Sequence, residues 1–442
     1  MTGLRLFDGT AGAAVVDVTP KRTIDLGGYA ARSGPMEGAL DSLEVRALVL
    51  GDGNVRQALV IIDTVAVDAR YVEQLKERVA AAACGTVDWG DGPIVELQVV
   101  AATHSHAAPS LAGALSATID EAWSADVTRA VIEAVRRAAN RSEPLRAYAA
   151  AAGLGDTVWD RVRERPVEGA ECRSWTFRRS SGELVAALVE LPGHPTVLGP
   201  RNRAASADLN GALRAELERR WPGCTVLVMT GAAADTNFTG ARPSDALRGD
   251  DGPDRTLERA RTIAVRIADA VGHAQREHAT AVPSAPAHTV RHEVRLQLAT
   301  PREARGATPD KPSGPVDLEA IRARRIAALA RDDARDARVT LTGAAFGALS
   351  LIAVPGELGM ALGTYARRCA DGRTGVPSTL IAGYANGYVG YLPSVTSPDD
   401  TSYERSVSPF DPSAAATLET GIATLAERLG EHRRAQAPMR KD

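Results

Sequence analysis

Cysteine is scarce in this 442-residue chain, and the few cysteines form no pattern. They stand singly, at Cys84, Cys172, Cys224 and Cys369. Without a Cys-x-x-Cys pair, the sequence excludes a zinc knuckle and a disulfide framework. Scattered thiols in a large chain are typical of a reducing compartment, so we expect a cytoplasmic protein.

Aromatic residues and an excess of charge of either sign are also lacking. Aromatics make up 4% of the chain, and the net charge is −3. Such a chain offers neither a stacking platform for bases nor a positive field that attracts phosphates. We therefore expect no nucleic-acid partner and look for a small-molecule substrate instead.

Long apolar runs are absent as well. No stretch approaches the roughly 18 apolar residues that a membrane-spanning helix needs. The N-terminus lacks the basic segment and apolar run of a secretion signal. We expect no stable membrane association. The hydrophobic residues, 44% of the chain, are spread along its length and are enough for a sizeable core.

The sequence does contain a regular alternation of strand and helix patterns, which predicts an α/β fold with a mixed β-sheet core flanked by helices. The predicted strands lie at 13–18, 43–50, 56–64, 95–102, 173–178, 184–191, 224–229, 289–298, 338–342 and 345–354. The predicted helices lie after an N-cap at Asp68 and at 119–140, 206–220, 255–276, 317–336 and 412–429. Polar stretches at 241–256 and 300–316 predict surface loops. No linker interrupts the pattern, so we expect one domain over residues 1–442.

Histidine is rare, and three of the eight histidines follow predicted strands. His104 and His106 lie in THSHAAPS, and His194 lies in LPGHPTVLGP. Strand ends are where an α/β sheet binds ligands. Residues two apart point the same way in an extended segment, so His104 and His106 suit two metal ligands, or one ligand and an acid/base partner. A structurally bonded pair and a simple Gly-His-Pro turn are the alternatives.

Four further polar residues stand in turn-rich segments after strands. Glu357 follows an apolar strand in VPGEL, where it suits either a metal or a helix N-terminus. Tyr391 lies in NGYVGYLP, where its ring can equally pack within the turn. Asp235 and Asn237 lie in GAAADTNF, a composition that suits an oxyanion site or a plain strand–turn–helix.

Taken in order, these motifs resemble the neutral (non-lysosomal) ceramidase family and its bacterial relatives. The order is ATHSH, GHPTVLGPRNRAASAD, TGAAADTN, VPGE and NGYVGYLP, preceded by DVTP, GGYAAR and a strand ending in IIDT. The resemblance covers about residues 12–430. It implies a single large catalytic domain of the neutral ceramidase kind. From the length we expect none of the C-terminal immunoglobulin-like domain that full-length ceramidases carry.

The resemblance also implies a metal site. In that family one zinc ion is held by two histidines, a glutamate and a tyrosine. Carried over motif by motif, the implied ligands are His104, His194, Glu357 and Tyr391. His106 is the implied neighbour of the metal, placed to bond the reacting carbonyl or to transfer a proton.

One departure from the family changes the expected mechanism. The ceramidases carry a serine in GD-x-S-P-N, and Asn237 occupies its place here, within Ala234-Asp235-Thr236-Asn237. Asparagine is no acyl-forming nucleophile, so water activated by the metal becomes the expected attacking group. His106, Asn237 and backbone amides would stabilise the oxyanion, and His106 or Asp235 would protonate the leaving amine.

We therefore expect a zinc-dependent hydrolase that cleaves an amide bond of a small N-acylated substrate. The same site would also suit an enzyme that forms an amide or a ring, or one that cleaves an ester or lactone, in a biosynthetic pathway. A non-catalytic ligand-binding descendant is the third alternative, although such a protein needs no complete set of metal ligands.

Overall fold

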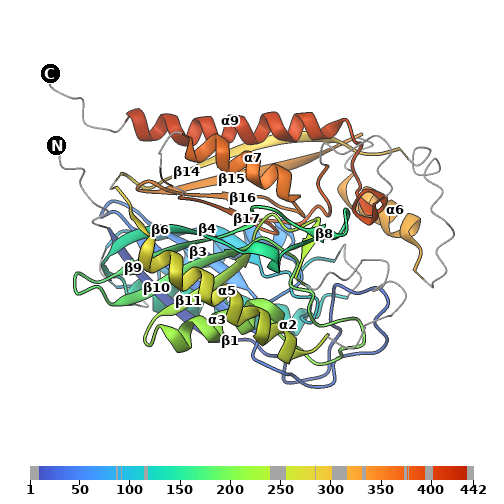
Figure 1. Cartoon of the computed structure of the whole chain (residues 1–442), viewed down its shortest axis with the longest axis horizontal. Helices are drawn as coiled ribbons and strands as arrows, with labels where there is room; N and C mark the ends of the chain where they lie inside the picture. The colour runs from blue at the N-terminus through green and yellow to red at the C-terminus, as the bar shows by residue number, and fades with distance from the viewer. Residues whose placement is uncertain are drawn as a thin grey trace.

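The described part of the chain folds into three large sheets, packed together and covered by helices on their outer faces, and one small sheet (Figure 1). This confirms the predicted α/β architecture with mixed sheets flanked by helices. The computed structural model describes residues 9–85, 88–90, 92–113, 118–238, 255–283, 285–300, 316–330, 335–372, 376, 378–393 and 402–435.

The first sheet has the strand order β4-β3-β2-β1-β5, in which only β3 and β4 are parallel. Its strands are β1 (Thr10–Asp17), β2 (Glu44–Gly51), β3 (Arg56–Ile62), β4 (Val95–Ala102) and β5 (Glu143–Pro144). Helices α1 (Ala69–Ala83) and α2 (Glu121–Asn140) pack on its outer face. The side chain of Asp68 caps α1, as predicted.

The second sheet has the order β11-β10-β9-β6-β13, in which only β10 and β11 are parallel. Its strands are β6 (Arg146–Gly153), β9 (Glu171–Arg178), β10 (Leu184–Leu191), β11 (Thr225–Thr230) and β13 (Thr280–Ala281). Helices α3 (Asp208–Arg220) and α5 (Leu257–Glu277) cover it.

The third sheet has the order β14-β15-β16-β17, with β16 and β17 parallel. Its strands are β14 (His288–Gln297), β15 (Asp336–Phe346), β16 (Leu349–Ala353) and β17 (Thr379–Ala382). Helices α7 (Met360–Asp371) and α9 (Ala414–Ala435) lie above it in Figure 1. A small sheet of β12 (Thr236–Asn237), β7 (Trp159–Asp160) and β8 (Arg165–Pro166) and the helices α6 (Leu318–Leu329) and α8 (Tyr403–Val407) lie beyond its end.

Both faces of the central strands are buried, because alternate residues of a strand belong to different cores, whereas alternate residues in the second half of β14 are exposed. In β2, Val45 and Val49 face the helices α1 and α2, while Leu48 and Leu50 face the other two sheets. In the same way, Leu188 of β10 joins the core shared by the three sheets. This arrangement explains why the strands appear in the sequence as continuous apolar runs.

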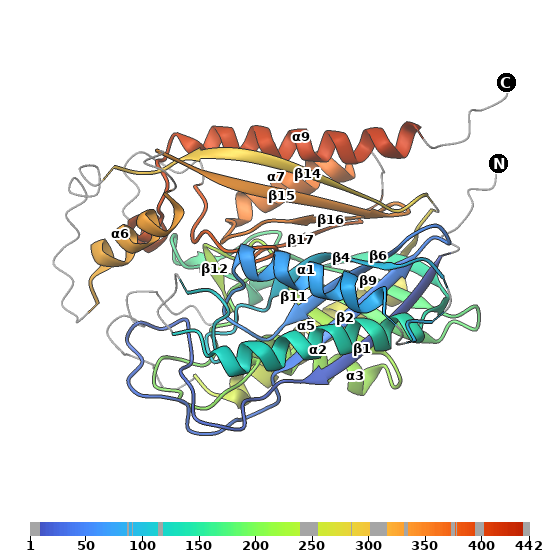
Figure 2. The same ribbon diagram turned by 180° about the vertical axis from the view of Figure 1, so that it is seen from behind.

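Each sheet contributes one parallel pair, and the carboxyl ends of these pairs meet. The pairs are β3/β4, β10/β11 and β16/β17. The loops that leave them lie on the side of the molecule where β12 and α6 are labelled in Figure 2. Ligand sites of open α/β sheets form at such carboxyl ends, so the topology itself points to this region.

Two of the predicted boundaries were wrong, and three elements were not predicted. The turn expected near 343–344 lies at Gly347 and Ala348, since β15 continues to Phe346. The helix expected to reach 336 ends at Leu329, and Asp336 already belongs to β15. Strands β6 and β17 and helix α7 were not predicted. Most of the expected loops 241–256 and 300–316 lie outside the described residues.

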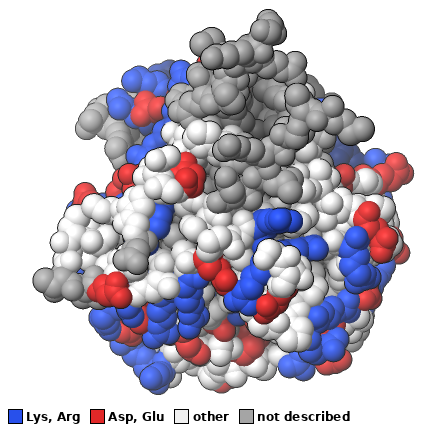
Figure 3. Space-filling view, turned by 90° about the vertical axis from the view of Figure 1, so that its left-hand side faces the viewer, with Lys and Arg blue, Asp and Glu red and all other residues white. Residues whose placement is uncertain are grey.

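No helix in the described ranges is long and apolar enough to cross a membrane. The face of the molecule in Figure 3 carries arginine, lysine, aspartate and glutamate side chains interspersed with one another. The described residues of this face form no continuous basic patch of the kind that attracts a nucleic-acid backbone.

A buried ion pair links the second sheet to the third. The guanidinium of Arg367 in α7 donates to Oε1 of Glu190 in β10, and the backbone N of Ile381 in β17 donates to Oε2 at 2.9 Å. The carboxylate is fully buried. Removing one partner of such a pair leaves an uncompensated charge in the interior.

We expect Arg367→Met to lower the free energy of unfolding by about 3–5 kcal/mol, because Glu190 stays buried without its cation. The double variant Glu190→Gln/Arg367→Met should recover most of this loss, since neither charge remains. Urea unfolding followed by circular dichroism measures both. As a control, Arg129→Met breaks the exposed pair with Asp126 and should cost less than about 1 kcal/mol. A loss of that size for Arg367→Met would contradict the prediction.

Candidate metal centre

The loops that follow β4, β10, β11, β16 and β17 bring the predicted site residues into one buried cluster. His104 follows β4, His194 follows β10, and Glu357 follows β16. Asn237 and Tyr391 come from the loops after β11 and β17. Backbone bridges join these loops in pairs, His194 with Asn237 and Glu357 with Tyr391. Residues far apart in the sequence therefore become neighbours here.

The imidazole of His104 is held in one orientation by the backbone. Its Nδ1 lies 2.7 Å from the carbonyl oxygen of Val65, which can only accept a hydrogen bond. Nδ1 therefore carries the proton, and Nε2 presents a lone pair. The ring of Tyr384 stacks on the imidazole with 3.9 Å between the ring centres. Burial lowers the pKa of His104 to about 3, so the ring is neutral near pH 7.

His194 is held in the same way by a different loop. Its Nδ1 lies 2.5 Å from the carbonyl oxygen of Ala233, and its backbone N donates to the carbonyl of Thr236 at 3.0 Å. In the neutral ring Nε2 is then the atom with the lone pair, and it lies 3.1 Å from Oε2 of Glu357. The Gly-His-Pro segment therefore does more than close a turn, because it aims Nε2 at a carboxylate.

Glu357 stands opposite both lone pairs. Its Oε2 lies 3.7 Å from Nε2 of His104 as well as 3.1 Å from Nε2 of His194, and its side chain is only 2% exposed. The hydroxyl of Tyr388 donates to Oε1. Burial raises the pKa of Glu357, but a proton shared with His194 or His104, together with the charge of Arg325, outweighs burial and brings the pKa to about 2. The carboxylate is therefore ionised.

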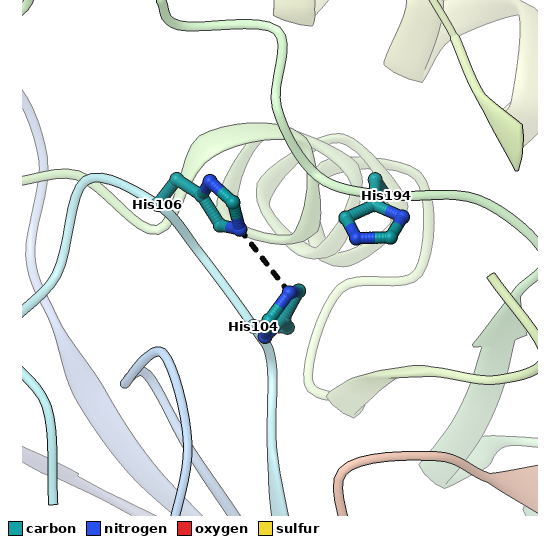
Figure 4. Close-up of side chains that lie close together, drawn as sticks. All are labelled: His104, His106 and His194. Carbon is teal, nitrogen blue, oxygen red and sulfur yellow. Dashed lines mark hydrogen bonds between the residues drawn. The ribbon is translucent and has the colours of Figure 1, made fainter. Parts of the chain in front are cut away.

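His106 completes a group of three histidines whose ring nitrogens lie within 4.8 Å of one another (Figure 4). Its Nε2 lies 3.1 Å from Nε2 of His104, and its buried Nδ1 has no partner in the described part of the chain. Burial lowers the pKa of His106 well below its usual value, so this ring is neutral too. Gly28 has φ of +90°, and a β-carbon there would lie 2.4 Å from Cγ of His106, so only glycine fits.

The donor atoms of this cluster suit a metal ion. Two imidazole lone pairs and an ionised carboxylate face one another, an arrangement that is repulsive without a cation or a proton between them. Tetrahedral ligands at roughly 2.0–2.2 Å from a metal lie about 3.3–3.6 Å apart. The distances of 3.1 and 3.7 Å from Glu357 to His194 and His104 are close to this range. The histidine cluster could therefore hold a metal.

Tyr391 lies beside the cluster, and its hydroxyl is bonded to an arginine. Nη2 of Arg161 donates to this hydroxyl at 2.8 Å and to the carbonyl of Ala234 at 2.5 Å. The ring of Tyr391 lies roughly parallel to that of His194, with 6.4 Å between the ring centres. Burial raises the pKa of Tyr391 well above its usual value, while the charge of Arg161 works in the opposite direction.

The two remaining predicted residues lie at the edge of the cluster. Oδ1 of Asp235 accepts a hydrogen bond from the backbone N of Met360 at 2.9 Å, so its carboxylate caps the start of α7. Asn237 is buried and pairs through its backbone with His194 and with Trp159 of β7. The hydroxyl of Thr236, between these two residues, donates to the carbonyl of Pro192 at 2.7 Å. This hydroxyl therefore stabilises the backbone of the loop.

The sequence alone did not point to Arg161, Tyr384 or the role of Tyr388. Arg161 follows a two-residue strand with no apolar run to mark it. Tyr384 follows β17, a strand that was not predicted, and its buried hydroxyl has no partner among the described residues. The only available signal was the cluster of three tyrosines in a chain with few aromatics.

Structural comparison finds the same fold in two solved proteins. Neutral ceramidase from Pseudomonas aeruginosa superposes with a TM-score of 0.74 and 18% identity, over 96% of this chain and 75% of that chain. A ceramidase complexed with C2 superposes with a TM-score of 0.75 and 18% identity, over 96% and 76%. By sequence, no family model and no curated protein matches. The chain therefore has the neutral ceramidase fold, as the order of motifs predicted.

We expect a divalent cation such as Zn²⁺ to raise the melting temperature of the protein by several degrees. Binding to the folded state alone contributes about 2.7 kcal/mol at a hundredfold excess over Kd. The double variant His104→Ala/His194→Ala should lose the shift, because two of the facing lone pairs are gone. Differential scanning fluorimetry after dialysis against chelator measures it.

The control for this experiment is His273→Ala/His278→Ala, which removes a pair of histidines at the end of α5, outside the cluster. It should keep the full shift. An unchanged shift in the His104→Ala/His194→Ala variant would mean that the cation binds elsewhere.

Proposed function

We propose that this protein is a zinc-dependent hydrolase that cleaves an amide bond of a small N-acylated molecule. One observation carries the proposal: His104 and His194 aim their Nε2 lone pairs at the ionised carboxylate of Glu357. Both rings are fixed in this tautomer by backbone carbonyls, which is how metal-binding histidines are commonly oriented. The neutral ceramidase fold makes an amide the first bond to test.

The donor set favours a transition metal such as zinc over calcium and magnesium. Imidazole nitrogens with one carboxylate suit Zn²⁺, whereas Ca²⁺ and Mg²⁺ prefer sites built of oxygen alone. His104, His194 and Glu357 would hold the ion, with Tyr391 as the fourth ligand once its hydroxyl turns from Arg161. When bound, zinc supplies Lewis acidity that polarises a substrate carbonyl and lowers the pKa of water toward about 7.

His106 is the residue best placed to handle the proton. It is neutral, it touches His104, and its Nδ1 has no partner in the described structure. A neutral imidazole has one nitrogen that accepts and one that donates, so it can take a proton and pass it to the leaving amine. Asp235 was the alternative, but its Oδ1 is engaged at the start of α7. We therefore assign proton transfer to His106.

Asn237 and nearby backbone amides would stabilise the negative charge that develops on the carbonyl oxygen. Asn237 is buried beside His194 and offers an amide donor at the place where the ceramidases carry a serine. A single oxyanion donor contributes about 2.7–4 kcal/mol to transition-state stabilisation. Because asparagine does not form acyl esters, water would attack the carbonyl directly, with no acyl-enzyme intermediate.

For His106→Ala we expect most of the bound zinc to remain and turnover to fall by about 10²–10³-fold, as for the loss of one proton-transfer group. Metal content by elemental analysis and initial rates measured on the same preparation check both parts. The reference variant is His104→Ala, which should lose the metal itself. If His106→Ala loses as much zinc as His104→Ala, His106 is a ligand and the assignment is wrong.

The proposed reaction can be tested by following amine release from matched substrates. We expect the zinc-loaded protein to release free amine from water-soluble N-acyl amines faster than from ceramide in detergent. Charged and polar groups such as Arg161 and Glu404 next to the site suit a small polar substrate. The variant His104→Ala/His194→Ala is the blank for metal-independent hydrolysis. Faster cleavage of ceramide would reverse the substrate assignment, and release of alcohol from esters alone would replace amide by ester hydrolysis.

A further inference from the structure

Arg325 lies beside the candidate centre and has no role in the mechanism proposed above. It belongs to α6, and only 9% of its surface is exposed. Its Nη1 donates to the carbonyl of Val407 at 3.0 Å. Its guanidinium carbon lies 5.8 Å from the centre of the Tyr391 ring, and that of Arg161 lies 6.0 Å from the same centre. Two guanidinium groups thus stand next to one candidate ligand.

Arg325 differs from most buried arginines of this protein in what it binds. Most of them pair with carboxylates, as Arg173 does with Asp371 and Arg214 with Asp63, while Arg56 donates to the backbone carbonyls of Trp89 and Pro93. Arg325 makes no ion pair within the described residues, and its buried Nε has no acceptor there. A buried cation without an anion is costly, so a chain that keeps one leaves a position for a negative group.

The charges around the candidate centre also favour binding of an anion, because the positive charges there outnumber the negative ones once a divalent metal is bound. Arg161 is balanced by Glu404, whose carboxylate lies 2.7 Å from its Nε. Glu357 balances one of the two charges of a divalent metal. Arg325 then adds a further positive charge, on which Glu357 acts only from a distance, without forming an ion pair. A substrate with a negative group would be attracted to this region more strongly than its neutral analogue.

We propose that Arg325 binds a carboxylate of the substrate, so that the enzyme acts on N-acyl compounds that carry an acidic group near the scissile amide. This rests on the proposed function. The guanidinium matches a carboxylate with two parallel N–H donors, and its Nε is available for one of them. The carboxylate can lie on the amine side of the amide, as in an N-acyl amino acid, or on the acyl side, as in the monoamide of a dicarboxylic acid.

Binding of matched pairs to the zinc-loaded protein tests the proposal without relying on turnover. One pair is N-hexanoylglycine and N-hexanoylglycinamide, and the other is N-hexylsuccinamic acid and N-hexylsuccinamide. By isothermal titration calorimetry we expect the acid of at least one pair to bind about 10- to 100-fold more tightly than its neutral twin. The pair that shows the preference identifies whether Arg325 binds a carboxylate on the amine side or on the acyl side of the amide.

Variants of α6 separate charge recognition from packing. Arg325→Met should abolish the preference for the acid, and Arg325→Lys should keep part of it, since it keeps the charge but loses the planar pair of donors. Arg322→Met is the matched control, because Arg322 donates to the carbonyl of Ser408, next to Val407, from the same helix. It should keep the preference in full.

Three outcomes would overturn the inference. The acid and its neutral analogue bind equally in both pairs, or no compound binds, or the preference for the acid survives Arg325→Met. Amine release measured on the same samples keeps the two proposals apart. Cleavage without a preference for the acid refutes only the role of Arg325. A preference that disappears in Arg325→Met, with no cleavage of any amide, supports the anion site and refutes the hydrolase.

Discussion

Two hydrogen bonds from imidazole Nδ1 to backbone carbonyls are the constraint on which the candidate centre depends. The carbonyls of Val65 and Ala233 take up the Nδ1 protons of His104 and His194 and leave both Nε2 lone pairs facing Glu357. Both acceptors belong to the main chain, in loops that follow strands of two different sheets. The position of the donor atoms is therefore set by how those sheets pack, and any displacement between the sheets would separate the lone pairs.

Polar contacts near the site keep the three sheets in register where apolar packing alone would allow them to slide. The hydroxyl of Thr230, at the end of β11, donates to the carbonyl of Thr103, just after β4. The side chain of Asn386 accepts from the backbone N of Val100 and donates to the carbonyl of Gln98, which joins the loop after β17 to β4. Such bonds are directional, and buried groups that lose them are costly. They make the junction of the sheets specific as well as stable.

The sequence predicted most of the strands and the main helices because each is a contiguous apolar run or an amphipathic stretch with a cap. Strand β6 was not predicted because its run of alanines has no strand preference, and it forms a strand through its pairing with β9 and β13. That His104 and Glu357 lie close together could be expected only from the family resemblance. The spacing of residues along the chain carries no information about which sheets pack against each other. Arg161 and Arg325 could not be found at all, because their positions depend on the packing of short segments without a pattern of their own.

Three residues around the centre, His104, Tyr384 and Asn386, have left-handed backbones, with φ of 61°, 54° and 59°. A residue with a β-carbon rarely adopts this conformation, which costs of order 1–3 kcal/mol and persists only where its surroundings enforce it. Here the enforcing contacts are main-chain hydrogen bonds formed when the chain folds, such as that from the N of His104 to the carbonyl of Thr64. The loops are therefore already shaped before any ion or substrate arrives. The loops would keep this shape after a bound ion leaves. The rate at which the ion exchanges would therefore depend on how easily it reaches the buried site, and not on refolding of the loops.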